Sequence, residues 1–561
     1  MRFLLILGAV VVTGCGSAPG PGSDAGPTDA GADAGTSDAG LSDAGLSDAG
    51  AADAGALDAG CTSPPTLEVD QVRLDTGVAQ GRTLGATRVF KGLPYAAPPL
   101  GALRWAPPAP AACWDGVRPA TGFGNVCLQR DSTGTPVGSE DCLTLNVWAP
   151  ATPPTTPLPV LVFVHGGSHV SGSSALRLLG IDVYDGQALA ERGAVVVTLN
   201  YRLGTLGYLA HPALAAADPR GVSGNYGLLD QLAALGWVQR NIAAFGGDAR
   251  RVLLFGHSAG AIDTCALLTS PLSEGLFSRA MMLSGHCNAF TKATAEASGL
   301  QTAARLGCDG GTKVADCLRS RSAAEVTTAA ITFGAATEDV GYQAPTIDGV
   351  VLPQHPGAAL VAGRFQHVPL VVSSTEQEFT TLLGNYGTHA VANDVEYRAA
   401  LAAYFGESLA DAVLAHYPSA SYPSPTLALV AAMGDSGFVC PSRGVARAAS
   451  KAQSAAVYRA HFTHVFSSGP LRPYLAGHGL DLYFGFRHLS YQGFTASAGE
   501  LSLADALSAA WVRFAATGDP NGQGLPTWPR YDAALDDALL LDDVPVMKNG
   551  IRTAECDFWS P

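Results

Sequence analysis

One serine of the sequence lies in the five-residue context that exposes a nucleophile. Gly256-His257-Ser258-Ala259-Gly260 follows a predicted strand, Arg251 to Phe255, and opens a segment of helical length. A Gly-x-Ser-x-Gly turn between a strand and a helix is too tight for side chains on its flanks, and it presents the serine hydroxyl at the end of the strand. We therefore predict that Ser258 is a nucleophile and that the backbone N–H of Ala259 faces the oxyanion formed on attack.

A second motif, His165-Gly166-Gly167-Ser168, follows the apolar run from Leu158 to Val164. Small residues let backbone N–H groups approach a developing oxyanion, and one such donor stabilises a transition state by about 2.7–4 kcal/mol. Taken alone, the motif is also compatible with a glycine-rich turn that binds nothing. Together with the Ser258 motif it predicts an oxyanion hole.

A serine hydroxyl is a weak nucleophile until a histidine, itself held by a carboxylate, takes its proton. In the strand–serine–helix class of hydrolases the chain order is serine, acid, histidine. His478 lies in a glycine-flanked loop, and Glu376 and Glu378 follow the apolar run from Val368 to Val372. We predict His478 as the base, while the spacing alone leaves the choice between the two glutamates open.

Three other histidines, His461, His464 and His488, are competing candidates for the base. The first two lie within or next to a predicted strand, Ala455 to Phe462. Side chains of a buried strand are normally part of the core, so we expect His461 and His464 to be structural.

The elements that must position these residues alternate between strands and helices. Short apolar runs bounded by Gly, Pro or Asn suit strands buried on both faces: 158–164, 194–199, 252–255, 280–283, 368–372 and 455–462. Segments of helical length and period lie between them: 226–242, 259–268 and 503–516. This order predicts an α/β fold of the α/β-hydrolase type, with a central, twisted, mostly parallel sheet and helices on both faces.

The N-terminus predicts export. Arg2, an apolar stretch too short to span a bilayer and small residues before Cys15 are typical of a secretory signal. Val12-Thr13-Gly14-Cys15 also resembles the bacterial lipobox, whose cysteine is lipidated, and an ordinary signal peptide is the alternative. We expect a lipoprotein signal peptide at 1–14, with lipidation of Cys15 and a membrane-anchored protein that faces the periplasm or the cell exterior.

A low-complexity segment separates this anchor from the rest of the chain. Residues 15–61 are built of Asp-Ala-Gly units that cannot form a core, which predicts a disordered tether. Residues 62–561 contain no second linker and read as one large domain. Eight aspartates of the tether contribute about half of the net charge of −15. The folded part is therefore only mildly acidic, and no feature of its charge indicates nucleic-acid binding.

Cysteine usage agrees with an exported protein. The chain has 11 cysteines, and setting Cys15 aside leaves an even number, for which disulfides are the default interpretation. No Cys-x-x-Cys or clustered Cys/His spacing indicates zinc, so we expect no metal and no other cofactor.

Several further stretches resemble the type-B carboxylesterase and cholinesterase family over essentially all of residues 62–561. They are Phe90-Lys91-Gly92-Leu93-Pro94-Tyr95-Ala96, Pro98-Pro99-Leu100-Gly101, Ser139-Glu140-Asp141-Cys142-Leu143, Phe245-Gly246-Gly247-Asp248, Ile347-Asp348-Gly349 and Phe514-Ala515-Ala516-Thr517-Gly518-Asp519-Pro520-Asn521. The resemblance implies a serine esterase that acts on small or medium carboxylic esters. A non-catalytic binding or adhesion module, which that family also contains, is the alternative.

The resemblance also assigns roles to residues. Counting from Pro369 in the family's pattern places the acid at Glu378, with Glu376 as the minority candidate, and His478 matches its His-Gly-x-Glu pattern with Asp481 in place of Glu. The implied oxyanion hole consists of the N–H groups of Gly167, Ser168 and Ala259, although Ser168 replaces the usual third glycine.

Three disulfides follow from the resemblance: Cys127–Cys142, Cys308–Cys317 and Cys440–Cys556. Of the cysteines that remain, Cys61 would pair with Cys113 and Cys265 with Cys287, but the latter two are equally compatible with buried thiols.

Departures from the family bear on the substrate. His257 stands where the family commonly has Glu, and the loop from Cys127 to Cys142 lacks the tryptophan with which cholinesterases hold a quaternary ammonium. Choline esters are therefore poor candidates. His169 stands at a position that is usually aromatic in the family, and Thr381 and Leu382 replace aromatic positions of the cholinesterase gorge, which indicates a less aromatic pocket. Lactones, polyesters and aryl or short acyl esters remain open, as does the oligomeric state.

Overall fold

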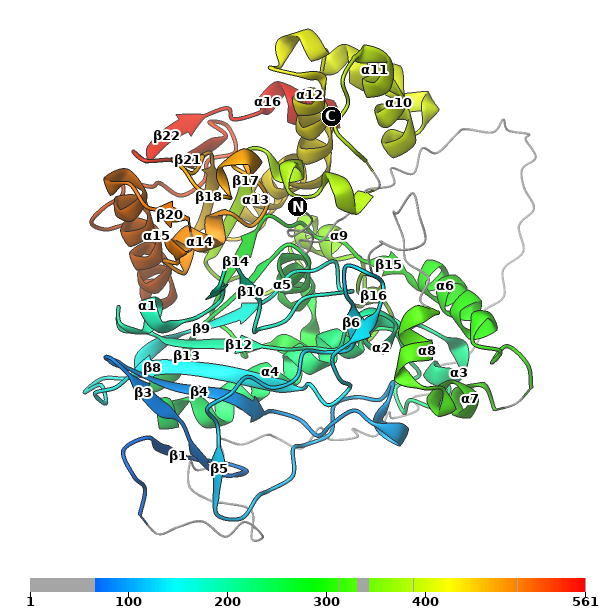
Figure 1. Cartoon of the computed structure of the whole chain (residues 1–561), viewed down its shortest axis with the longest axis vertical. Helices are drawn as coiled ribbons and strands as arrows, with labels where there is room; N and C mark the ends of the chain where they lie inside the picture. The colour runs from blue at the N-terminus through cyan, green and yellow to red at the C-terminus, as the bar shows by residue number, and fades with distance from the viewer. Residues whose placement is uncertain (1–65, 312, 330–342, 387, 492, 560–561) are drawn as a thin grey trace, which may run out of the picture. The chain divides into compact units, whose positions relative to one another are not determined.

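A computed structural model describes residues 66–311, 313–329, 343–386, 388–491 and 493–559 of the chain. Its centre is an eleven-stranded sheet in the order β22-β21-β18-β17-β14-β13-β9-β12-β8-β4-β3 (Figure 1). From one edge to the other, these strands are β22 (Val546–Asn549), β21 (Asp537–Leu541), β18 (Val457–Phe462), β17 (Leu370–Thr375), β14 (Arg279–Leu283), β13 (Gly247–His257), β9 (Leu158–Val164), β12 (Val195–Leu199), β8 (Thr144–Pro150), β4 (Thr87–Pro94) and β3 (Arg82–Leu84).

The middle of the sheet is parallel and its two edges are antiparallel. Every pairing from β12 through β9, β13, β14, β17 and β18 to β21 is parallel. The pairings β12–β8, β8–β4, β4–β3 and β21–β22 are antiparallel. Because parallel strands end at the same edge, the segments that follow β9, β13, β14 and β17 emerge side by side.

The central strands are apolar throughout because both faces of the sheet are covered. In β9, Val160, Val162 and Val164 belong to one core, whereas Leu161 and Phe163 belong to the other. The first core includes side chains of α4 (Tyr226–Asn241), α5 (Ala259–Thr269) and α13 (Cys440–Ala452). The second includes α1 (Gln187–Ala190), α14 (Asp481–Gly485) and α15 (Ala498–Thr517), which Figure 1 shows on the other face.

A third, separate cluster of buried side chains is formed by residues after β17. It gathers Phe379 and Leu382 with side chains of α10 (Asp394–Phe405), α11 (Glu407–His416) and α12 (Pro425–Gly434). The remaining α-helices are α2 (Gly204–Tyr208), α3 (Pro212–Ala215), α6 (Lys292–Arg305), α7 (Val314–Ser320), α8 (Ala323–Thr328), α9 (Pro356–Val361) and α16 (Thr553–Trp559). Short strands outside the main sheet are β1 (Gln71–Leu74), β2 (Gly77–Gln80), β5 (Val117–Pro119), β6 (Gln129–Arg130), β7 (Pro136–Val137), β10 (Arg177–Leu178), β11 (Ile181–Asp182), β15 (Phe290–Thr291), β16 (Thr346–Ile347), β19 (Ser490–Tyr491) and β20 (Phe494–Thr495).

The fold-class prediction is confirmed, with shifts at element boundaries. The strand predicted from Val368 begins at Leu370, since Pro369 has no N–H to donate, and it continues through the polar Ser373, Ser374 and Thr375. The helix predicted from Leu503 begins earlier, at Ala498, because Ser497 and Glu500 form a capping box.

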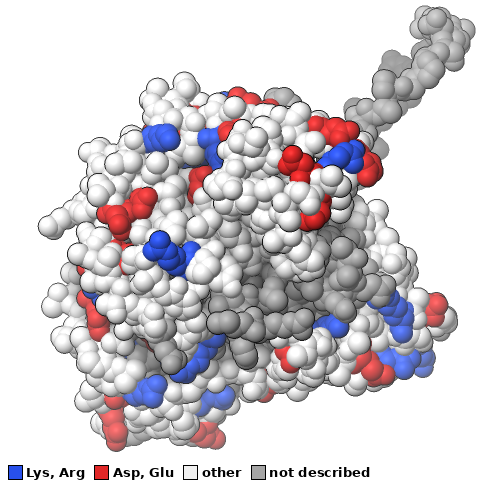
Figure 2. All heavy atoms as spheres, turned by 45° about the horizontal axis from the view of Figure 1, so that its top comes forward, with Lys and Arg blue, Asp and Glu red and all other residues white. Residues whose placement is uncertain are grey.

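Charged side chains are scattered over the face drawn in Figure 2, where neither sign gathers into one large patch. Among the residues that the structure describes, no helix combines the length and the apolarity needed to cross a bilayer.

Candidate active site

Ser258 lies at the turn between β13 and α5 with φ 57° and ψ −121°, a backbone conformation that is costly for a residue with a side chain. The flanking glycines leave no room for a methyl group. A Cβ on Gly256 would lie 2.0 Å from the carbonyl oxygen of Gly260, and a Cβ on Gly260 would lie 2.1 Å from that of Val164. These contacts explain why the sequence has glycine on both sides of the turn.

The loop after β9 lies against this turn. A Cβ on Gly166 would lie 2.8 Å from the Cβ of Ser258. Three consecutive residues of the loop have positive φ: Gly167 at 117°, Ser168 at 54° and His169 at 59°. At Gly167 only glycine fits, because a Cβ there would lie 1.9 Å from the carbonyl oxygen of Ser171. The loop thus reaches the nucleophile turn in a tightly constrained backbone conformation.

Ser168 adopts the left-handed conformation despite its side chain. Its carbonyl oxygen accepts a hydrogen bond from the N–H of Gln343 at 2.9 Å. The carbonyl oxygen of Gly167 accepts from the N–H groups of Val170 and Ser171, both at 2.9 Å. These bonds fix the direction of both peptide units in the predicted oxyanion loop.

Glu378 and His478 form a fully buried pair. Oε2 of Glu378 lies 2.5 Å from Nδ1 of His478, and neither side chain is exposed. Oε1 of Glu378 accepts from the hydroxyl of Ser284 at 2.8 Å and from the N–H of Thr375 at 2.7 Å. The pair directs Nε2 of His478 away from the carboxylate, and this atom has no hydrogen-bond partner among the residues that the structure describes.

Burial is the main influence on both groups. It raises the pKa of Glu378 to about 7, while the hydrogen bonds from Thr375 and Ser284 act to lower it. Burial lowers the pKa of His478, which favours the neutral imidazole. A neutral imidazole with one nitrogen held by a carboxylate is the form in which a histidine can accept a proton.

Backbone contacts join the segments that carry this pair. The N–H of Gln377 donates to the carbonyl oxygen of Ala476 at 3.0 Å, and the side-chain oxygen of Gln377 accepts from the N–H of Ala476 at 3.0 Å. Next to Ser258, the N–H of the serine donates to the carbonyl oxygen of Leu283 at 2.9 Å. Leu283 precedes Ser284, so β14 links the nucleophile turn to Glu378.

The structure separates the two candidate acids. Glu376 does not contact His478; its carboxylate instead lies 2.7 Å from Nε2 of His461 and 2.7 Å from Nη2 of Arg552. These partners lower the pKa of Glu376 although burial raises it. Glu376 is thus held by other groups, whereas Glu378 is placed on His478.

The other histidines are held elsewhere. Nδ1 of His461 lies 3.0 Å from the hydroxyl of Ser374, and His488 lies 3.0 Å from the carbonyl oxygen of Asp185. His464 lies between Glu500 at 3.3 Å and Asp542 at 3.0 Å. These contacts agree with the structural roles predicted for His461 and His464.

His257 is a buried neighbour of the pair. Its ring centroid lies 4.4 Å from that of His478, and neither ring nitrogen has a hydrogen-bond partner among the described residues. Burial and the adjacent His478 hold the pKa of His257 well below its usual value. This imidazole is therefore neutral in the place where the family commonly has a glutamate.

Two features of the site were not found from the sequence. Ser284 donates to Glu378, and its position directly after the apolar run 280–283 is the signal that could have indicated it. Asp481 was noted only as a replacement for Glu. Its side chain is fully buried, and burial together with the charge of Glu378 raises its pKa to about 7.

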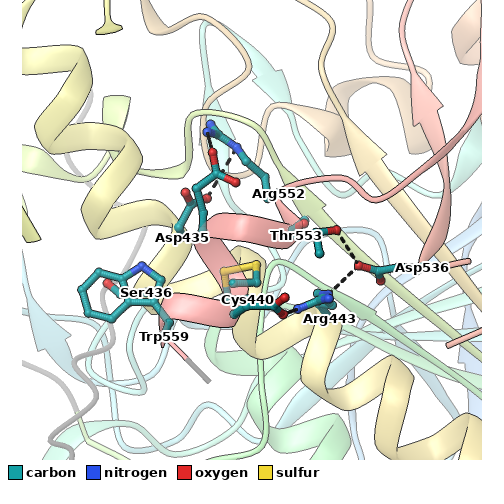
Figure 3. Close-up of a disulfide and its surroundings, with 12 residues drawn as sticks. Asp435, Ser436, Cys440, Arg443, Asp536, Arg552, Thr553 and Trp559 are labelled. Carbon is teal, nitrogen blue, oxygen red and sulfur yellow. Dashed lines mark hydrogen bonds and ion pairs between the residues drawn. A yellow bond between two sulfur atoms is a disulfide. The ribbon is translucent and has the colours of Figure 1, made fainter. Parts of the chain in front are cut away.

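Four predicted disulfides are present: Cys127–Cys142, Cys265–Cys287, Cys308–Cys317 and Cys440–Cys556. Cys265 and Cys287 are therefore bonded rather than free thiols. Figure 3 shows the Cys440–Cys556 bridge between α13 and α16, close to Arg443 and its ion pair with Asp536. Cys61, the predicted partner of Cys113, lies outside the described residues, as do Cys15, the predicted signal peptide at 1–14, the whole predicted tether at 15–61 and residues 62–65 of the domain.

A mostly parallel sheet with a serine turn at the end of a central strand defines an α/β-hydrolase. Residues 68–559 match the carboxylesterase family, and the chain belongs to that family.

Named relatives agree with this assignment. The chain is 38% identical to the fumonisin B1 esterase of Sphingopyxis macrogoltabida, over 84% of this chain and 86% of the relative. It is 35% identical to the para-nitrobenzyl esterase of Bacillus subtilis, over 84% and 95%. It is 34% identical to the human cocaine esterase, over 84% and 86%. The chain is thus a carboxylesterase of the serine hydrolase class, which favours the enzyme prediction over a non-catalytic binding module.

Proposed function

We propose that the chain hydrolyses small or medium carboxylic esters through an acyl-enzyme formed on Ser258. His478 is the general base, and Glu378 orients it. The observation that carries this proposal is the buried contact of 2.5 Å between Glu378 and His478. The ring of His478 lies 4.4 Å from that of His257, the residue directly before Ser258.

The proposed reaction has two steps. The oxygen of Ser258 attacks the ester carbonyl while Nε2 of His478 takes the hydroxyl proton, and the N–H groups of Gly167, Ser168 and Ala259 stabilise the oxyanion. His478 then protonates the leaving alcohol, which leaves an acyl group on the serine. In the second step His478 takes a proton from water, the hydroxide attacks the acyl-enzyme, and the serine leaves with that proton.

The test is the Ser258→Ala variant. Loss of a triad serine can lower kcat about a millionfold, and we expect hydrolysis of p-nitrophenyl acetate to fall by at least about four orders of magnitude. The thermal unfolding midpoint should stay within a few degrees of the wild type, which excludes loss of the fold as the cause. Hydrolysis at the wild-type rate by the folded variant would remove the proposal.

We propose that the preferred esters are uncharged near the scissile bond. The neutral His257 supplies no negative charge next to His478, and the names of the relatives include a para-nitrobenzyl esterase. Among p-nitrophenyl esters of increasing acyl length, kcat/KM should be highest for short or medium chains. A higher kcat/KM for a choline ester than for its uncharged isostere would contradict this substrate class.

We also infer that the domain, residues 62–561, is exported and tethered to a membrane through residues 15–61 and a lipid on Cys15. The lipobox-like Val12-Thr13-Gly14-Cys15 supports this inference. In a detergent phase separation of the full chain expressed in a bacterium, the wild type should enter the detergent phase and Cys15→Ala the aqueous phase. Equal partition of the two proteins into the aqueous phase would contradict a lipid anchor.

A further inference from the structure

His169 follows the proposed oxyanion donor Ser168 and is buried, with 1% of its surface exposed. Its Nδ1 lies 2.7 Å from the carbonyl oxygen of Gln343, and its Nε2 lies 2.8 Å from Oδ1 of Asp263. A carbonyl oxygen can only accept a hydrogen bond, so Nδ1 carries a proton. The remaining nitrogen therefore faces a carboxylate.

Asp263 lies in the second turn of α5 and has no exposed surface. Its Oδ2 accepts from Nε2 of Gln231 at 2.6 Å and from the hydroxyl of Tyr208 at 3.4 Å. Donors from three segments, namely the oxyanion loop, α2 and α4, thus converge on this side chain. Such convergence fixes the orientation of the carboxyl group of Asp263.

A buried carboxyl group destabilises the fold unless its oxygens are hydrogen-bonded. Among the described residues, Asp263 forms no ion pair with a lysine or an arginine, and His169 is its only basic partner. Both ring nitrogens of His169 are engaged, Nδ1 by the carbonyl oxygen of Gln343 and Nε2 by Oδ1 of Asp263. The contact between His169 and Asp263 is therefore a buried hydrogen bond between the oxyanion loop and α5.

This pair joins the two halves of the proposed catalytic machinery. His169 belongs to the loop that carries Gly167 and Ser168, whereas Asp263 belongs to the helix that starts directly after Ser258. The loop holds three consecutive positive φ angles, a conformation that persists only when surrounding contacts impose it. Oxyanion donors are effective only when they are already placed at the reacting oxygen.

We propose that the buried His169–Asp263 hydrogen bond is a positioning device that holds the oxyanion loop against the nucleophile helix. The proposal rests on the acyl-enzyme function inferred above. In the family position 169 is usually aromatic, and a phenylalanine there could not form this hydrogen bond.

The test compares the wild type with His169→Phe, Asp263→Asn and the double variant. Pre-steady-state acylation by p-nitrophenyl acetate is measured well below the unfolding midpoint of each protein. We expect each single variant to lower the acylation rate and kcat by about 10- to 100-fold, since loss of one oxyanion donor costs about 100- to 1,000-fold. KM should change by less than about threefold, because substrate binding in the ground state does not use the oxyanion geometry.

The double variant should be no slower than the slower single variant, since both substitutions remove the same interaction. Glu140→Gln is the matched control. It breaks the buried ion pair between Arg104 and Glu140, whose side chains are 8% and 9% exposed. This variant should destabilise the fold without lowering the acylation rate. If His169→Phe destabilises the protein too far, Asp263→Asn, which preserves the side-chain volume, carries the test.

The proposal would be overturned if the folded single variants acylate at rates within twofold of the wild type. It would also be overturned if the double variant's loss of acylation rate equals the product of the two single losses. The Ser258→Ala variant is assayed in parallel. If it retains activity, the acyl-enzyme function itself is wrong; if it is inactive while the pair variants are unaffected, only the positioning role is wrong.

Discussion

At the scale of single residues, the chemistry of the site depends on which side chains are neutral. His257 is buried next to His478 and has its pKa held well below the usual range. It therefore cannot act as the carboxylate that the family commonly has before the serine. The electrostatic environment of His478 is consequently set by Glu378 on one side and by an uncharged ring on the other.

We predict that His257→Glu raises the pKa of His478. A carboxylate a few ångströms from an imidazole stabilises the imidazolium, by on the order of one pKa unit. A base with a raised pKa becomes protonated at higher pH, so on acidification the variant should lose activity before the wild type does. The acid limb of the kcat/KM profile for a neutral ester measures this shift.

His257→Gln serves as the uncharged control for that experiment, and its acid limb should stay at the wild-type pH. An acid limb of His257→Glu that is unmoved, or that moves to lower pH, would show that residue 257 does not interact electrostatically with the base.

Local motifs predicted Ser258 and His478, because each residue lies in a short pattern whose glycines reveal the turn that the backbone must make there. The acid could not be fixed in the same way, since Glu376 and Glu378 are only two residues apart and follow the same apolar run. What distinguishes them is that Glu376 is held by Arg552, a residue 176 positions away. The partnership of His169 with Asp263, which are 94 positions apart, is hidden from local motifs for the same reason.

At the scale of elements, the disulfides differ in how much of the chain they close. Cys440–Cys556 joins the start of α13 to α16 across 116 residues, whereas Cys308–Cys317 spans 9. A disulfide restricts the unfolded chain more when its loop is longer. The two bridges should therefore differ in their contribution to stability.

We predict that replacing both cysteines of the 440–556 bridge by alanine lowers the free energy of unfolding by about 2 kcal/mol more than the same change at 308–317. Urea unfolding of both double variants and the wild type, followed by fluorescence, measures the difference. Equal losses at the two bridges would show that loop closure is not the main origin of their effect.

The central strands were predictable because continuous apolar runs suit strands with two covered faces. Strand β4 was not predicted, since Arg88, Lys91 and Gly92 interrupt its apolar residues. Lys91 is tolerated there because its ammonium group lies 3.7 Å from the ring centroid of Phe123 and 3.5 Å from Asp182. Such compensation comes from other parts of the chain and leaves no local pattern.

At the scale of the whole molecule, Ser258, Glu378 and His478 come from segments at least 100 residues apart. Ser258 and Glu378 follow β13 and β17, which are parallel strands of one sheet, separated only by β14, and end at the same edge. The order of motifs and the parallel sheet predicted this shared edge. The contact between acid and base, however, depends on the loop at residues 474–478, whose path the sequence did not indicate.

The most direct test of the central claim is covalent labelling of the intact protein with an organophosphate, followed by mass spectrometry of the whole chain and of its peptides. An activated serine should take up one equivalent, located on Ser258, and ester hydrolysis should disappear in proportion to the label. His478→Ala should prevent labelling, since the hydroxyl is then no longer activated. Label on any other residue, or hydrolysis that persists when Ser258 is fully labelled, would contradict the account.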